Sequence, residues 1–147
     1  MMNKNTLAYY LRDSAEDKNI GDSVSIVGQR GILDDFVSTH SELRDWNIVE
    51  FSDDGYSGTT FQRPGIQKLL EGIRCGEING IIVKDFSRFG RNYIEVGDYL
   101  EQIFPFLGIR FISVNDGFDS AKTGCSAGDV SIAFKNLLHD NYAKDIS

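Results

Sequence analysis

Four short apolar runs alternate along the chain with longer stretches of helical spacing, and this alternation constrains the fold more than any other feature. The apolar runs are residues 6–12, 46–51, 80–85 and 109–116. Short apolar runs of this length are typical of strands, and the continuous apolar run at 80–85 is typical of a buried strand. Strands that alternate with helices favour a mostly parallel central sheet with helices on both faces. The sequence therefore predicts an α/β fold.

The helical stretches between these runs have identifiable ends. Ser23 or Ser25 is suited to cap a helix over residues 25–40, and Pro64 stands at the favoured first position of the next helix, which Gly76 ends.

Three further segments complete the secondary-structure prediction. Residues 87–108 are expected to be mostly helix and to end at Gly108, and residues 116–124 are expected to form a loop. Residues 127–146 place apolar side chains on one face, which predicts a long C-terminal helix.

The 147 residues suit one domain, and no composition break divides them. We expect residues 1–147 to be a single domain truncated from a longer protein, because the last helix stops at Ser147 without a cap. The N-terminal residues resemble neither a signal peptide nor a membrane span. Two cysteines in a domain of this size are typical of a reduced, cytosolic protein, so a cytoplasmic protein is expected.

The chain offers no pattern for a metal or cofactor. Cys75 and Cys125 form no spacing motif, and His40 and His139 stand far apart. The formal net charge of −7 argues against strong general binding to nucleic acid. Several arginines nevertheless stand in short motifs beside Gly, Ser and Asp, which suits chemistry on a phosphate with bulk DNA affinity supplied elsewhere.

These arginines fall at predicted strand ends, where parallel sheets bind ligands. Arg12 and Ser14 are two residues apart and would share one face of a strand. Arg88 and Arg91 are three apart at a predicted helix start, where a shared helix face would suit a phosphate. Each pattern alone is common, and a solvated basic face is the ordinary explanation of Arg-x-x-Arg.

Two other side chains could join the same crevice. Arg63 precedes Pro64 at a third strand-to-helix junction, and Gln29 lies one turn into the first helix, although both could be plain surface residues. Preorganised guanidinium groups can hold the oxygens of a transferring phosphoryl group without a metal. Serine is a weak nucleophile that needs a base or a strongly positive setting. Asp54 or Asp85 could orient the arginines, and Asp85 could equally be a helix cap.

Five segments, in order, resemble motifs of the resolvase–invertase, or serine recombinase, catalytic domain. They are YLRDS (10–14), SIVGQ (25–29), DDGYSGTTFQRPG (53–65), VKDFSRFGRN (83–92) and FISVND (111–116). The sequences of these segments look most like those of the large serine recombinases, which include transposases and integrases of mobile elements.

The resemblance implies that Ser14 attacks a DNA phosphate and becomes linked to a 5′ end. It implies that Arg12, Arg63, Arg88 and Arg91 hold the phosphate. Supporting positions carried over from the motifs or the crevice are Gln29, Asp54, Ser57 and Asp85. The implied partners are DNA and further copies of the protein, which assemble as dimers and tetramers through the C-terminal helix. No metal or nucleotide cofactor is implied.

Two positions depart from the family pattern. Ser87 precedes Arg88 where small resolvases carry aspartate, and Asp13 stands where an apolar residue is usual. Two other functions remain open on the residues alone. A non-catalytic α/β phosphate-binding module would form no bond to DNA, and a nuclease with metal on Asp53, Asp54 and Asp85 would lose activity to a chelator.

Overall fold

A five-stranded sheet runs through the domain, with its strands in the order β2-β1-β3-β4-β5. The computed structural model describes residues 5–13, 25–55 and 61–121 of the chain. The strands are β1 (Thr6–Asp13), β2 (Asn47–Asp54), β3 (Gly80–Val83), β4 (Arg110–Ser113) and β5 (Phe118–Asp119). Strands β1 to β4 run parallel to one another, and β5 is antiparallel to β4. The predicted mostly parallel sheet is therefore confirmed.

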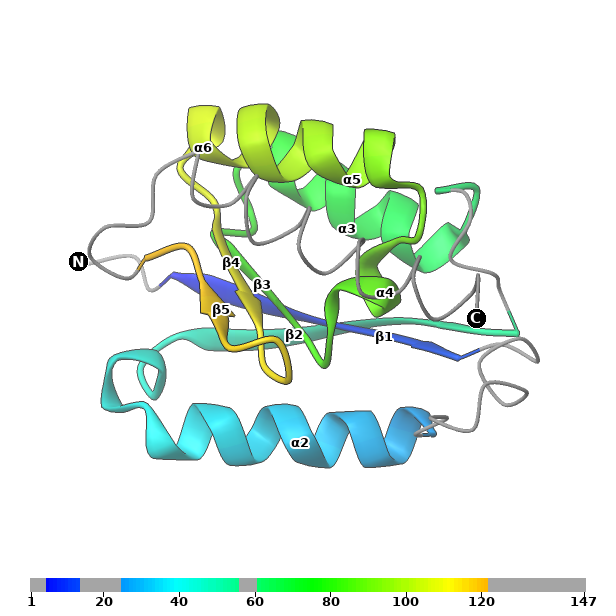
Figure 1. Ribbon diagram of the computed structural model, residues 1–147. Coiled ribbons are helices and arrows are strands. Elements are labelled where there is room, and N and C mark those ends of the chain that lie inside the picture. The colour runs from blue at the N-terminus through cyan, green and yellow to red at the C-terminus, as the bar shows by residue number, and fades with distance from the viewer. Residues whose placement is uncertain (1–4, 14–24, 56–60, 122–147) are drawn as a thin grey trace.

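Helices cover both faces of this sheet (Figure 1). One face carries α2 and the other carries α3 to α6. The helical elements are α2 (Ile26–Thr39), the short 3-10 turn η1 (Ser41–Leu43), α3 (Pro64–Arg74), α4 (Phe86–Phe89), α5 (Tyr93–Asp98), the π-helical turn η2 (Tyr99–Ile103) and α6 (Phe104–Leu107). Within the described ranges, no helix has the length and apolar character needed to cross a membrane.

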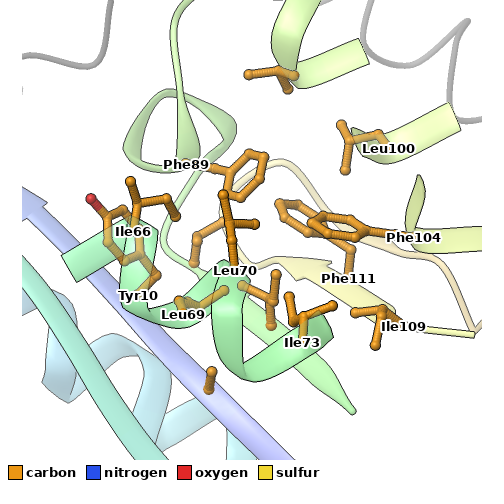
Figure 2. Close-up of a cluster of buried hydrophobic side chains, with 14 of the residues drawn as sticks. Tyr10, Ile66, Leu69, Leu70, Ile73, Phe89, Leu100, Phe104, Ile109 and Phe111 are labelled. Atoms are coloured by element: carbon orange, nitrogen blue, oxygen red, sulfur yellow. The ribbon is translucent and has the colours of Figure 1, made fainter. Parts of the chain in front are cut away.

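Strand β1 supplies side chains to a hydrophobic cluster on each face. Leu7, Tyr9 and Leu11 join the cluster beneath α2, and Ala8 and Tyr10 join the larger one beneath α3 to α6. All five are at most 3% exposed. Figure 2 shows the larger cluster, where side chains of α3 meet aromatic rings from α4, α6 and β4. Fully burying one such side chain stabilises the folded state by about 1.5–3 kcal/mol. The two clusters together therefore hold the helices against both faces of the sheet.

The first two helices begin as the sequence predicts. Ser25 caps α2, because its Oγ accepts a hydrogen bond of 3.2 Å from the backbone N–H of Gly28. Pro64 opens α3. Proline has no backbone N–H, but at the first helical position that N–H would have no intrahelical partner, so its absence costs nothing. Gly76 follows the end of α3 with φ +78°, a conformation that favours glycine.

Residues 87–108 are mostly helical, as the sequence predicts, but the helix is interrupted near its start. The turn α4 ends at Phe89, and the backbone is extended at Gly90. Gly90 packs so tightly that a Cβ there would lie 2.8 Å from both Phe61 and Val96. The helix restarts at α5, where the Asn92 side chain accepts hydrogen bonds from the next turn. The strand end and the following helix are thus joined by a separate turn.

Two later segments also differ from expectation. A π-helical turn, η2, precedes Pro105, whose ring cannot donate a backbone hydrogen bond and crowds the preceding turn. The predicted loop over 116–124 contains the two-residue strand β5, which pairs with Ile112 and Ser113 of β4. The expected C-terminal helix over 127–146 lies outside the described residues.

Candidate active site

The predicted arginines gather where the chain reverses direction across the sheet. From β1 the chain passes through α2 to β2 on one side, and then returns through α3 to β3 on the other. The carboxyl ends of β1 and β3 therefore border the topological switch point of the sheet, where such folds bind ligands. Arg12 lies at the end of β1, and Arg88 lies on the turn that follows β3.

Arg12 and Arg88 hold each other's backbone. The Arg12 guanidinium donates to the carbonyl of Ser87 at 2.6 Å and to the carbonyl of Arg88 at 3.2 Å. Arg88 in return donates from its guanidinium to the carbonyl of Arg12 at 3.2 Å. Arg12 is 0% exposed and Arg88 is 2% exposed. The two strand ends are therefore joined by a reciprocal pair of buried guanidinium groups.

Gln29 completes the hold on the end of β1 from the opposite face. Its Oε1 accepts from the Arg12 backbone N–H at 3.2 Å, and its Nε2 donates to the Arg12 carbonyl at 2.9 Å. The amide thus pairs with Arg12 as a neighbouring strand would. Gln29 is completely buried, so it is not the surface glutamine that the sequence left possible.

Arg63 enters the same site from the start of α3. Its guanidinium donates to the carbonyl of Phe89 at 2.6 Å, to that of Arg88 at 3.4 Å and to the Tyr10 hydroxyl at 2.7 Å. Burial lowers the pKa of Arg63, against the opposing effects of Tyr10 and Asp53. An arginine titrates so far above neutrality that it keeps its charge. The site therefore holds a third desolvated cation.

Asp53, which sequence reasoning did not place among the supporting residues, organises this corner. Its carboxylate accepts from the backbone N–H of Gly65 at 2.7 Å and of Ile66 at 3.0 Å, at the N-terminus of α3. It also accepts from the Tyr10 hydroxyl at 2.7 Å. Its neighbour Asp54 is exposed. A strand alternates its side chains between faces, so only one of two adjacent aspartates could face this cluster.

Asp85 anchors the turn that carries Arg88. Its carboxylate accepts from the Arg88 backbone N–H and from the Ser87 hydroxyl, and it contacts the buried Lys84 ammonium at 3.3 Å. Burial acts to raise the pKa of Asp85, but the Ser87 hydrogen bond and the Lys84 and Arg88 charges outweigh it and hold that pKa below its ordinary value. Asp85 is therefore an ionised cap, and Ser87 supplies a hydroxyl where small resolvases carry a carboxylate.

A second carboxylate, Asp116 after β4, reaches the same turn. It accepts from the Phe86 backbone N–H at 2.8 Å and from the Ser113 hydroxyl at 2.6 Å. Burial raises the pKa of Asp116, with the Asp85 charge adding to the rise. The sequence placed Asp116 where a predicted strand ends and a predicted loop begins, and it gave no signal of this contact, since the contact joins segments 30 residues apart.

The remaining predicted residues are placed less centrally. Arg91 is half-buried and follows the α4 turn. The tight packing of Gly90 ends that turn between Arg88 and Arg91. The two arginines therefore do not share the helix face that their spacing predicted. Asp13 is 6% exposed, and its Oδ1 has no hydrogen-bond partner in the described part of the chain. Ser14 and Ser57 lie outside the described residues.

Two carboxylates of this edge have structural roles. Asp53 caps α3 and Asp85 caps α4. Across residues 5–13, 25–55 and 61–121, no three His, Cys, Asp or Glu side chains are grouped so as to hold a metal ion. The site's chemistry on the described residues is instead that of concentrated guanidinium groups, which suit a phosphate or another oxyanion.

The fold and site thus define an α/β domain with buried arginines gathered at the switch point of its sheet. The family model described as "Resolvase, N terminal domain" matches residues 7–137. The chain belongs to the resolvase family, and it is the catalytic domain of a site-specific DNA recombinase of the serine class.

Solved structures agree with this assignment. The N-terminal catalytic domain of TP901-1 integrase is 19% identical with a TM-score of 0.70, covering 97% of this chain and 99% of that one. A resolvase family site-specific recombinase from Streptococcus pneumoniae is 26% identical with a TM-score of 0.66, covering 97% and 94%. A serine recombinase from Sulfolobus solfataricus is 25% identical with a TM-score of 0.57, covering 76% and 69%. Among curated protein sequences, none matches the chain.

Proposed function

We propose that this domain cleaves and rejoins DNA at recombination sites through a covalent bond to Ser14, without a metal ion. The Ser14 hydroxyl loses its proton and attacks a backbone phosphorus, and the bond from phosphorus to the 3′ oxygen breaks. The departing 3′ oxygen takes up a proton, and the 5′ phosphate stays on the serine. After strand exchange, a free 3′ hydroxyl attacks the phosphoserine ester and restores the DNA. The ester conserves the bond energy, so no nucleotide is consumed.

The observation that carries this proposal is the convergence of Arg12, Arg63 and Arg88 on one turn. All three are at most 2% exposed, and their guanidinium groups donate to peptide carbonyls at the end of β1 and on the α4 turn. Charge that develops on a phosphate is stabilised most by donors that are already oriented in a site shielded from water. Ser14 follows Arg12 by two residues. In this proposal the phosphate oxygens replace the carbonyls as acceptors when DNA enters.

The other predicted residues take supporting roles in this proposal. Gln29 binds the backbone at the end of β1, which Ser14 follows in the sequence. Asp85 caps the turn that carries Arg88. Arg91 is proposed as a further phosphate ligand, and Asp54 and Ser57 as supporting residues; these three assignments rest on the family resemblance.

The proposed partners are DNA and further copies of the protein. A net charge of −7 supports a domain that acts within a longer recombinase whose other regions bind DNA. Self-association to dimers and tetramers is proposed through the C-terminal helix over 127–146. We place the protein in the cytoplasm and among the integrases and transposases of mobile elements, on the wording of its motifs.

The decisive experiment traps cleaved DNA on the intact protein and identifies the attached peptide by mass spectrometry. Ser14→Ala is expected to abolish the adduct while leaving DNA binding nearly unchanged, because the hydroxyl acts only in the chemical step. Arg88→Ala is expected to slow adduct formation about 100–1000-fold, as for loss of one electrostatic donor.

The matched control is Ser38→Ala, which removes an exposed hydroxyl that donates to the Asp35 carbonyl, away from the arginines. It is expected to cleave as the unchanged protein does, and excess chelator is expected to change nothing. Attachment of DNA to another residue, or cleavage by Ser14→Ala, would refute the proposed mechanism.

A further inference from the structure

Tyr10 stands between two buried groups of opposite charge. Its hydroxyl accepts a hydrogen bond of 2.7 Å from Arg63 and donates one of 2.7 Å to Asp53. All three residues are at most 2% exposed. One hydroxyl oxygen therefore separates a guanidinium from a carboxylate in a region of low dielectric, where their attraction is much stronger than in water.

We propose that Tyr10 is a positioning residue that keeps Arg63 on the active-site turn and out of a direct ion pair with Asp53. Arg63 has two other acceptors on that turn, the carbonyls of Phe89 at 2.6 Å and Arg88 at 3.4 Å. The Arg63 guanidinium also lies 5.5 Å from the centre of the Tyr10 ring, so the ring supports the same placement. The inference rests on the proposed role of Arg63 in holding the DNA phosphate.

The carboxylate is fixed, so without the hydroxyl it is Arg63 that moves. Asp53 is held by the backbone N–H groups of Gly65 and Ile66 at the start of α3. Its movement toward Arg63 would uncap that helix. The Arg63 side chain is long and can rotate toward Asp53, and doing so draws it away from the Phe89 carbonyl.

The Tyr10 hydroxyl keeps its proton at neutral pH, because burial raises its pKa. Burial raises the pKa of Tyr10 well above its ordinary value; the Arg63 charge opposes this rise, while the hydrogen bond and charge of Asp53 add to it. The hydroxyl therefore remains a donor to Asp53 and an acceptor from Arg63.

The adjacent residue Tyr9 offers a matched control. Its hydroxyl donates to the Asp34 carboxylate at 2.8 Å, a bond of the same chemical type and nearly the same length. Tyr9 belongs to the cluster beneath α2, on the sheet face opposite Tyr10. Tyr10→Phe and Tyr9→Phe each remove one oxygen atom and leave the ring in place, but only the first touches Arg63.

The test has two measurements. In the intact recombinase at saturating DNA, Tyr10→Phe is expected to form the Ser14 adduct about 10- to 100-fold more slowly, the effect expected of a misplaced catalytic group, with DNA affinity unchanged. Tyr9→Phe is expected to keep the original rate. In the DNA-free protein, nuclear magnetic resonance of the Arg63 side-chain N–H is expected to show a changed environment in Tyr10→Phe and none in Tyr9→Phe.

A second substitution separates positioning from stability. Asp53→Asn removes the negative charge and keeps an oxygen that can accept from α3, so the double variant Tyr10→Phe, Asp53→Asn is expected to recover most of the lost rate. Further loss in the double variant, or equal rates for Tyr10→Phe and Tyr9→Phe, would overturn the positioning role. If the unchanged protein forms no Ser14 adduct, the proposed function fails, and the Arg63 resonance alone then decides whether Tyr10 positions it.

Discussion

Replacing Asp53 with alanine is expected to lower the free energy of unfolding by about 2–5 kcal/mol. The side chain is 2% exposed and accepts three hydrogen bonds, two from the N-terminus of α3 and one from Tyr10. Loss of a helix cap costs about 1–2 kcal/mol. Leaving the buried Tyr10 hydroxyl without its acceptor costs about 1–3 kcal/mol more. Both losses fall on the junction between β2 and α3.

The assay is equilibrium unfolding of the isolated domain in urea, with Asp54→Ala as the control. Asp54 is the next residue of β2 and is exposed, so its loss is expected to change stability by less than about 0.5 kcal/mol. Both variants remove one negative charge, so a general electrostatic effect would move them equally. Equal midpoints for the two variants, or greater destabilisation by Asp54→Ala, would refute the assignment of Asp53 as the organising carboxylate.

Two further substitutions test the turn between β3 and α5. Gly90→Ala is expected to destabilise the domain by about 1–3 kcal/mol in thermal unfolding, because the added Cβ would lie 2.8 Å from the packed Phe61 ring. The control Gly97→Ala is expected to be neutral or stabilising, because its Cβ meets nothing within 4 Å. Equal effects of the two substitutions would contradict the packing argument. Asp85→Asn is expected to destabilise the domain at pH 7 and to leave it as stable as the unchanged protein in strong acid. The pKa of Asp85 is lowered in the folded state, so its ionised form stabilises the fold above the unfolded pKa of about 4. That stabilisation is lost as the pH falls through the folded pKa. A pH-independent difference in unfolding free energy would show that the Asp85 charge is not responsible.

Much of the fold was readable from the sequence because its signals are local. Continuous apolar runs predicted four of the five strands, and Ser25, Pro64 and Gly76 marked helix ends through their own backbone chemistry. The two-residue strand β5 gave no such signal, since it is defined by pairing with β4 rather than by its own pattern. The break at Gly90 was missed for a similar reason, because glycine alone does not reveal the rings packed against it.

The candidate site divides in the same way. The motifs of the sequence, with the family they resemble, were enough to select Arg12, Arg63, Arg88 and Gln29, and the structure brings these four together. Their spacing could not show that the guanidinium groups are buried and bonded to peptide carbonyls. That arrangement depends on strands β1 and β3 lying side by side, and their site residues are more than 70 positions apart in the chain.

The sequence by itself determined that this is an α/β domain with arginines at its strand ends, because strand and helix periodicity and motif order are written along the chain. Tertiary structure alone decided between the adjacent residues Asp53 and Asp54, and gave Tyr10 its place between Asp53 and Arg63. Side chains alternate along a strand, but which set faces the core depends on the register with the neighbouring strand. In β2, an edge strand whose first four residues are exposed, the apolar pattern is too weak to reveal that register before β1 is paired with it.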